Sequence, residues 1–348
     1  MGMPGARALS DHLIPSETGQ RGRRSPNTES APVSAGKSST VHIYFAAYLC
    51  AVVLIFLGTL RHLAAFALHH ESCSHIPFIP LISAYLIFLE RKRVFSNIRR
   101  AFTIGGVLLL LGIASYWMSR NNSFSLNEND ALSWATASIV VICIAGFVIC
   151  YGSRVSRHAL FPLLFLFLMV PVPTVVFERM ILLLREGSTS LTMGIFHLLN
   201  VPADRNGFTI SVPGVTIEVA QECSGIRSTL ALFITCLLAS YLFLRTNIRR
   251  VAFVLLVVPM SVVKNGIRIA TLTVLSLYVD PGFLYGRLHH EGGIVFFLLA
   301  LLLLAPILWL LQKSERPKHP KVSARADTQK LDGNAAAVAE KTKPAPGS

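Results

Sequence analysis

The stretch "AQECSGIRSTLAL" (residues 220–232) opens with polar residues around Cys223 and then turns apolar for a length that can cross a membrane. Glu222 and Ser224 flank the cysteine, and Arg227 follows one helical turn later. A cysteine needed only for packing could lie anywhere along such a helix. The stretch therefore predicts a membrane helix and raises the question of whether the thiol at its polar start has a chemical role.

The composition of the whole chain supports the membrane interpretation. Of the 348 residues, 53% are hydrophobic and 14% are charged, whereas typical soluble domains have about 25% charged residues. The net charge of +14 is concentrated in basic clusters between apolar runs, which is the distribution that the positive-inside rule describes. We therefore expect a multi-pass membrane protein that does not bind nucleic acid.

Apolar stretches of membrane-spanning length recur along the chain and predict an all-α polytopic membrane protein with about eight transmembrane helices. We place them at residues 43–65, 76–90, 101–118, 131–151, 159–183, 223–244, 250–278 and 290–311. The second stretch contains two prolines, so we expect it to be broken or tilted. The basic, polar segments 1–41 and 312–348 are predicted to be disordered tails around one transmembrane domain, 42–311.

The basic clusters fall on alternate connections between the predicted spans. They lie in both tails and near residues 90–100, 153–158 and 245–250, which places that side of the membrane in the cytoplasm together with both termini. The opposite side carries the longest connection, 184–222. We therefore predict that this connection lies outside the cytoplasm.

The long outer connection is predicted to have structure of its own. Residues 185–200 are typical of a helix that lies near the membrane interface. The stretch "GFTISVPGVTIEVA" (207–220) alternates apolar and polar residues around a Pro-Gly turn, which predicts a β-hairpin. This hairpin would deliver the chain directly to Cys223.

The six cysteines show neither a CxxC pair nor metal-ligand spacing. Cys50, Cys143, Cys150 and Cys236 lie inside apolar runs, where cysteine usually acts as a small hydrophobic residue. We predict no disulfide framework, no metal site and no cofactor.

Three kinds of polar group are predicted to lie at one level of the outer leaflet. Cys223 is at the outer end of the sixth span. Arg268 lies about 15 Å below the outer tip of the seventh span, by the rise of an α-helix. His289 and His290 are at the outer mouth of the eighth span. Positive charge activates a thiol, a guanidinium stabilises a thiolate or an oxyanion, and a histidine transfers protons, so this set favours thiol nucleophilic catalysis.

Each of these residues also has a structural interpretation. Cys223 could pack the end of its helix, and the two histidines could be solvated loop residues. Arg268 could extend its charge to the interface or form an ion pair with Glu218, Glu222 or Glu291. The residues alone leave these alternatives open.

Further motifs point to a known family. In this order, "ECSGIRSTLALF", "NGIRIATL" and "LHHEGGIVFFLLAL" resemble the motifs of the exosortase/archaeosortase family of polytopic membrane transpeptidases. The stretch "CSHIPFIPLISAYLIFLERKR" (73–93) resembles that family's outer-loop histidine segment, and "MVPVPTVVFERMILLL" (169–184) resembles its Pro-x-Pro entry to the long outer segment. The likeness covers about residues 43–311.

The resemblance implies a sortase-like reaction and roles for the polar residues. Cys223 would be the nucleophile that forms an acyl-thioester, and Arg268 the proton donor or oxyanion stabiliser. His289 is selected as the family's histidine by its spacing to Gly293, with His290 as the alternative.

The resemblance also implies substrates and a location. The substrates would be exported proteins whose C-terminal sorting signal consists of a short motif, a membrane helix and a basic cluster. Cleavage would take place at the extracytoplasmic face of the cell inner membrane, with water, a membrane lipid amine or a glycan as acyl acceptor. The favoured bacterial branch of the family is linked to exopolysaccharide production. A polytopic transporter and a structural component of a polysaccharide-export complex are the alternative functions.

Overall fold

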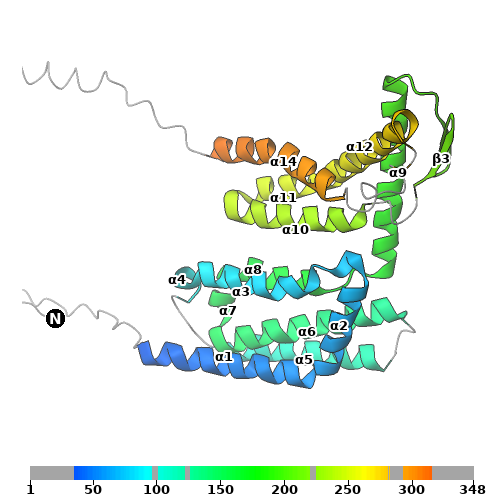
Figure 1. Cartoon of the computed structure of the whole chain (residues 1–348). Helices are drawn as coiled ribbons and strands as arrows, with labels where there is room; N and C mark the ends of the chain where they lie inside the picture. The colour runs from blue at the N-terminus through cyan, green and yellow to red at the C-terminus, as the bar shows by residue number, and fades with distance from the viewer. Residues whose placement is uncertain are drawn as a thin grey trace, which may run out of the picture.

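The computed structural model describes residues 35–95, 101–121, 126–219, 225–280, 282 and 293–315. Most of its helices run alongside one another, and a small sheet lies at one end (Figure 1). The long helices are α1 (Ala35–Ile55), α5 (Phe102–Arg120), α6 (Glu128–Tyr151), α9 (Thr174–Leu198), α10 (Ile226–Phe243), α12 (Val257–Tyr278) and α14 (Gly293–Glu315). The short helix α11 (Asn247–Leu255) precedes α12.

The described helices form a multi-pass membrane protein. Five of them are long and apolar enough to cross a membrane, where α11 and α12 are taken together as one helix. Two further pairs of helices are each joined at a sharp bend, and if each pair is one span the described residues contain up to seven spans. The predicted second span is a shorter helix over Ile76–Leu89, in which α3 (Ile79–Leu89) follows a short 3₁₀ turn, η2 (Ile76–Phe78). The all-α polytopic fold class is confirmed.

Two of the predicted spans are wrong as continuous helices. The first span bends by 75° at Phe56, where α1 ends and α2 (Leu57–His69) begins. The fifth span ends at Met169, and α9 starts after a turn of 87°. Prolines at positions 171 and 173 lie in this turn, and a proline can neither donate a helical hydrogen bond nor follow a helical residue without steric conflict.

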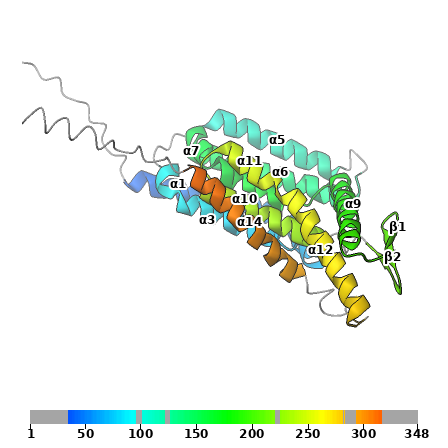
Figure 2. The same cartoon turned by 90° about the horizontal axis from the view of Figure 1, so that it is seen from above.

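Because of this turn, α9 crosses the direction of the other helices (Figure 1) and is seen nearly end-on from above (Figure 2). It includes the predicted end of the fifth span and most of the helix predicted over 185–200. A helix is therefore present in this range, but it begins at Thr174 and ends at Leu198.

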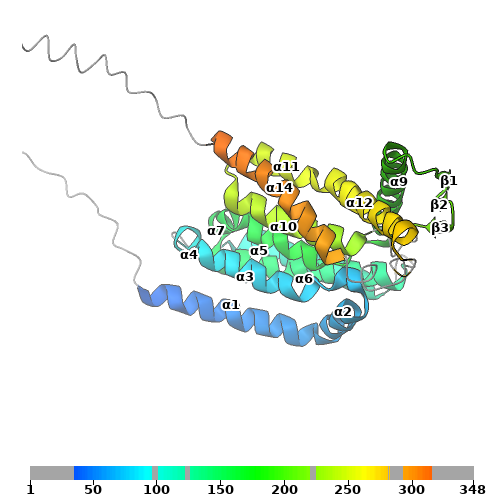
Figure 3. The same cartoon turned by 45° about the horizontal axis from the view of Figure 1, so that its top comes forward.

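The two ends of the helix bundle carry different elements. The start of α1 and the end of α14 lie at one end, together with the basic helices α4 (Arg91–Val94) and α7 (Ser153–His158) (Figure 1). Helix α9, the sheet and the end of α12 lie at the opposite end (Figure 1 and Figure 3). The described start of α1 and end of α14 therefore lie at the same end of the bundle.

The sheet extends the predicted hairpin by one strand. Strands β1 (Asp204–Asn206), β2 (Thr209–Val212) and β3 (Val215–Glu218) pair antiparallel in that order. Gly214, with φ of 91°, permits the tight turn between β2 and β3. One face of the sheet packs on α9 and α12 in a cluster of buried residues: Phe196, Val201, Ile210, Val212, Val219, Ile269 and Ala270. The sheet is therefore fixed to the two helices that carry the candidate site.

Candidate functional site

The structure describes one of the predicted site residues. Arg268 lies on α12, half-buried, with its Nε atom buried. Cys223, His289 and His290 lie outside the described residues. The described part of the candidate site consists of α12 and the residues on either side of the segment that contains Cys223.

Helix α12 presents a polar face within an apolar helix. Lys264 and Asn265 are adjacent, and Ser261 and Arg268 lie three or four residues from each of them, which places all four on one side of the helix. Ser261, Lys264 and Asn265 are 0%, 3% and 1% exposed. Buried polar and charged side chains in a membrane helix are costly, and they usually mark a functional site.

Helices α9 and α12 approach each other closely through small residues. A Cβ added at Gly187 would lie 2.9 Å from the side chain of Val262, and one added at Gly266 would lie 2.8 Å from that of Leu191. Thr192 Oγ1 donates a hydrogen bond of 3.2 Å to the Gly266 carbonyl. Close packing through small residues, together with hydrogen bonds between helices, fixes the rotation of α12 and hence the direction of its polar face.

The polar face is also bonded to α9. The Asn265 side-chain amide donates to the Ser188 hydroxyl at 3.0 Å, and Ser188 is fully buried. An asparagine held by its amide cannot turn away from the neighbouring helix without leaving buried polar groups unsatisfied.

The first residues of α10 pack directly on the polar face of α12. Gly225 adopts a left-handed conformation with φ of 68°, and a Cβ there would lie 3.0 Å from Asn265 Oδ1 and 3.4 Å from Lys264 Nζ. Lys264 Nζ donates a hydrogen bond to Ser228 Oγ, and Ser228 Oγ donates to the Gly225 carbonyl at 3.0 Å. A glycine is needed for both the backbone conformation and the close approach. The chain entering α10 is thus fixed against Lys264 and Asn265.

The chain leaving the sheet is anchored as well. Arg185 on α9 donates from Nε to the Val219 carbonyl at 2.7 Å, and its guanidinium lies 4.0 Å from the centre of the Phe208 ring. The Val219 N–H donates to the Phe208 carbonyl at 2.9 Å. The residues on either side of the segment 220–224, Val219 and Gly225, are therefore both held in place.

Sequence reasoning missed two of these contributors. Arg185 lies in the range predicted as an interfacial helix, and nothing in its neighbours distinguishes it from a surface cation. Ser228 resembles the many hydroxyl residues that bond to their own helix. Lys264 and Asn265, in contrast, could be found from their spacing of four and three residues to Arg268.

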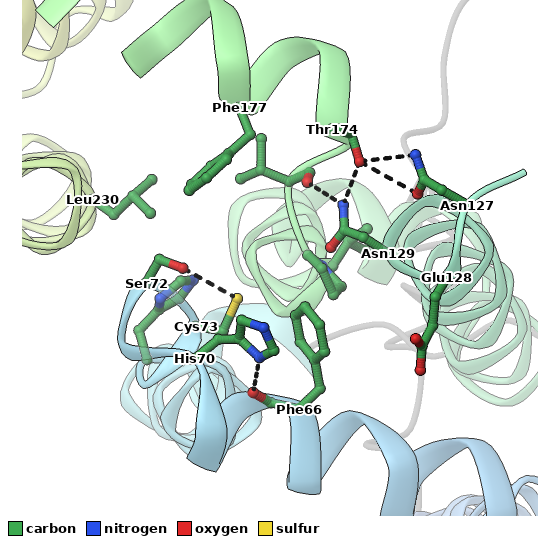
Figure 4. A pocket seen from close by; sticks show the side chains of 14 residues that line it. Phe66, His70, Ser72, Cys73, Asn127, Glu128, Asn129, Thr174, Phe177 and Leu230 are labelled. Atoms are coloured by element: carbon green, nitrogen blue, oxygen red, sulfur yellow. Dashed lines mark hydrogen bonds between the residues drawn. The ribbon is translucent and has the colours of Figure 1, made fainter. Parts of the chain in front are cut away.

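A cavity of about 570 Å³ lies beside the start of α10. It is lined by Phe66, His70, Ser72, Cys73, His75, Asn127, Glu128, Asn129, Val170, Pro171, Val172, Thr174, Phe177 and Leu230 (Figure 4). Burial lowers the pKa of His75, an effect that backbone hydrogen bonds with Leu168 and Ser72 partly oppose. The cavity thus contains the histidine of the "CSHIPFIPL" segment.

Comparison with known proteins gives one match. A family model described as transmembrane exosortase matches residues 67–306. This range includes His75 in the cavity, Gly225 and the polar face of α12. No curated protein and no solved structure matches the chain.

Proposed function

The chain belongs to the transmembrane exosortase family, and from this membership and the candidate site we propose that it is a membrane-embedded cysteine transpeptidase or protease. Its substrates would be exported proteins that end in a short motif, a membrane helix and a basic cluster. It would cut them at the extracytoplasmic face of a bacterial inner membrane and transfer them to water, a lipid amine or a glycan. We also propose the link to exopolysaccharide production that the family resemblance implies.

The observation that carries this proposal is the contact between Gly225 and the polar face of α12. Cys223 precedes Gly225 by two residues, and two residues of extended chain span at most about 7 Å. Gly225 is packed against Lys264 and Asn265, and Arg268 lies one turn further along the same face. This geometry supports a site in which the thiol and the guanidinium act on the same peptide bond.

The charges on α12 suit a thiolate nucleophile. No ion pair among the described residues involves Lys264, whose ammonium group contacts the entry to α10. A nearby positive charge stabilises a thiolate, and Lys264 and Arg268 provide two such charges. The buried surroundings strengthen the interaction, because a low dielectric screens charges less than water does.

The proposed reaction has two steps. The Cys223 thiolate attacks the scissile carbonyl carbon, and Arg268 stabilises the oxyanion that forms. The C–N bond then breaks, the amine leaves with a proton from the histidine, and an acyl-thioester remains on Cys223. In the second step the acceptor attacks the thioester, its proton passes to the histidine, and the thiolate is released.

A reporter assay tests the function. The reporter is a secreted soluble domain fused to the C-terminal tail of a co-encoded protein that ends in a motif, an apolar helix and an arginine cluster. Co-expression with the chain should shorten the reporter and separate it from its membrane helix. A reporter of unchanged mass, in cells where the chain is abundant in the membrane, would contradict the proposal.

The proposed orientation can be checked with a membrane-impermeant thiol reagent in a chain whose native cysteines have been replaced. A cysteine at Thr216, which is exposed on β3, should react in intact cells because the sheet is proposed to lie outside. A cysteine at Ser314, which is exposed at the end of α14, should react only after the membrane is opened. The reverse pattern would place the site on the cytoplasmic side.

His289 is proposed to be the acid/base histidine. Adjacent positions of a helix point about 100° apart, so only one of His289 and His290 can face the site if the helix of the eighth span extends to them. His289→Ala should lower the rate of reporter processing on the order of 10²-fold, the usual effect of losing a general acid or base. His290→Ala serves as the matched control and should have a much smaller effect. Equal, small losses in both variants would remove histidine from the mechanism.

A further inference from the structure

The cavity beside the start of α10 has no part in the reaction steps above. We propose that it is a substrate subsite that binds a short extended peptide segment next to the scissile bond, with apolar side chains of that segment inside the cavity. This inference rests on the proposed function and names the part of the protein that recognises the substrate.

The size and walls of the cavity suit a peptide segment. Its volume of about 570 Å³ falls within the range of about 300–1,000 Å³ that is usual for ligand pockets. Apolar side chains form much of the lining, and the Phe177 and Leu230 side chains point toward one another across from Ser72 and Cys73 (Figure 4).

The cavity is preformed by hydrogen bonds that hold the Pro171–Pro173 turn to the start of α6. The Thr174 N–H donates to Asp130 Oδ1 at 2.6 Å. The Asn129 side-chain amide donates to the Val172 carbonyl at 3.0 Å. A wall that is already rigid loses little conformational entropy when a ligand binds.

The cavity shares an apolar cluster with the start of α10. Phe177 and Leu230, which line it, belong to the same apolar cluster as Ile226, the first residue of α10. Ile226 follows Gly225 directly and follows Cys223 by three residues. A peptide in the cavity would therefore lie beside the segment that carries the nucleophile.

The mixed lining favours a peptide over an acyl chain. Polar residues such as His70, Ser72 and Asn129 line the cavity beside its apolar walls. A peptide backbone needs such hydrogen-bonding partners, whereas a lipid tail does not. Burial lowers the pKa of His75, which keeps its ring uncharged near pH 7, and backbone hydrogen bonds with Leu168 and Ser72 hold the ring in place.

Filling the cavity provides the first test. Leu230→Trp should lower kcat/KM for the reporter by at least about tenfold, because a larger side chain occupies the space of the peptide. The rate at which iodoacetamide alkylates Cys223, measured in a chain without the other five cysteines, should stay unchanged. Leu242→Trp is the matched control, since Leu242 is exposed on the same helix and should tolerate the change.

The outcomes separate this inference from the proposed function. Normal processing by Leu230→Trp, with Cys223→Ala inactive, would overturn the subsite and leave the transpeptidase intact. Normal processing by Cys223→Ala would overturn the proposed function itself.

Native Cys73 allows a second test that does not depend on the tryptophan variant. A benzophenone maleimide attached to Cys73, in a Cys223→Ala chain whose other cysteines are replaced, should cross-link on illumination to the reporter at the residues before its membrane helix. Cross-links to lipid alone, or to the reporter's soluble domain alone, would overturn the proposal.

Discussion

Cys223→Ala is expected to abolish processing of the reporter, while the protein stays inserted and abundant in the membrane. Removing a catalytic nucleophile leaves only the contributions of binding and oxyanion stabilisation, so the loss should be on the order of 10⁴-fold or more. The fold should survive, because Gly225, Ser228 and Lys264 hold the start of α10 to α12 without the thiol.

Cys236→Ala is the matched control for this result. Cys236 lies on the same helix and is buried in an apolar cluster, where it acts as a packing residue. This variant should process the reporter at nearly the normal rate. Cys223→Ser adds a further distinction, because a transporter or a structural subunit should tolerate a hydroxyl in place of the thiol and a thiol transpeptidase should not.

Arg268→Lys is expected to process the reporter nearly as poorly as Cys223→Ala. The rate should fall on the order of 10²–10³-fold, which is the usual effect of losing an oxyanion donor. A lysine keeps the charge but replaces the planar, forked set of donors by a single ammonium group. Lys264 already places an ammonium group one turn away. A second ammonium group would therefore add charge without restoring the geometry.

The control for this variant is Arg205, an arginine at the same end of the molecule. Arg205 forms an ion pair with Glu186 at 2.6 Å, which a lysine can retain, so Arg205→Lys should have little effect on processing. Processing by Arg268→Lys at the normal rate would reduce Arg268 to a generic positive charge.

Most of the fold could be predicted from local patterns. Apolar runs of membrane length identified the helices, and the Pro-Gly turn at Pro213 and Gly214 identified the hairpin. The bend at Phe56 could not be predicted, since no proline lies near it and Gly58 and Thr59 alone do not show that a helix turns. The turn at the Pro-x-Pro motif had a local signal, but periodicity alone could not show that α9 turns across the bundle.

Less of the candidate site could be predicted, because its contacts join distant parts of the chain. The spacing on α12 shows that Lys264, Asn265 and Arg268 share a face, but not what lies against it. The contact with Gly225 depends on how α10 packs on α12, and the anchor between Arg185 and Val219 depends on where the sheet docks on α9. Neither leaves a pattern within one segment.

The most direct test of the central claim is detection of the acyl-thioester. The chain is incubated with the reporter, quenched in acid, and analysed by mass spectrometry for a covalent adduct with the shortened reporter. We expect the adduct to be attached at Cys223, to be released by neutral hydroxylamine and to be absent from Cys223→Ala. Processing of the reporter without any such adduct in the wild-type chain or in the slower His289→Ala variant, or an adduct attached at another residue, would contradict the account.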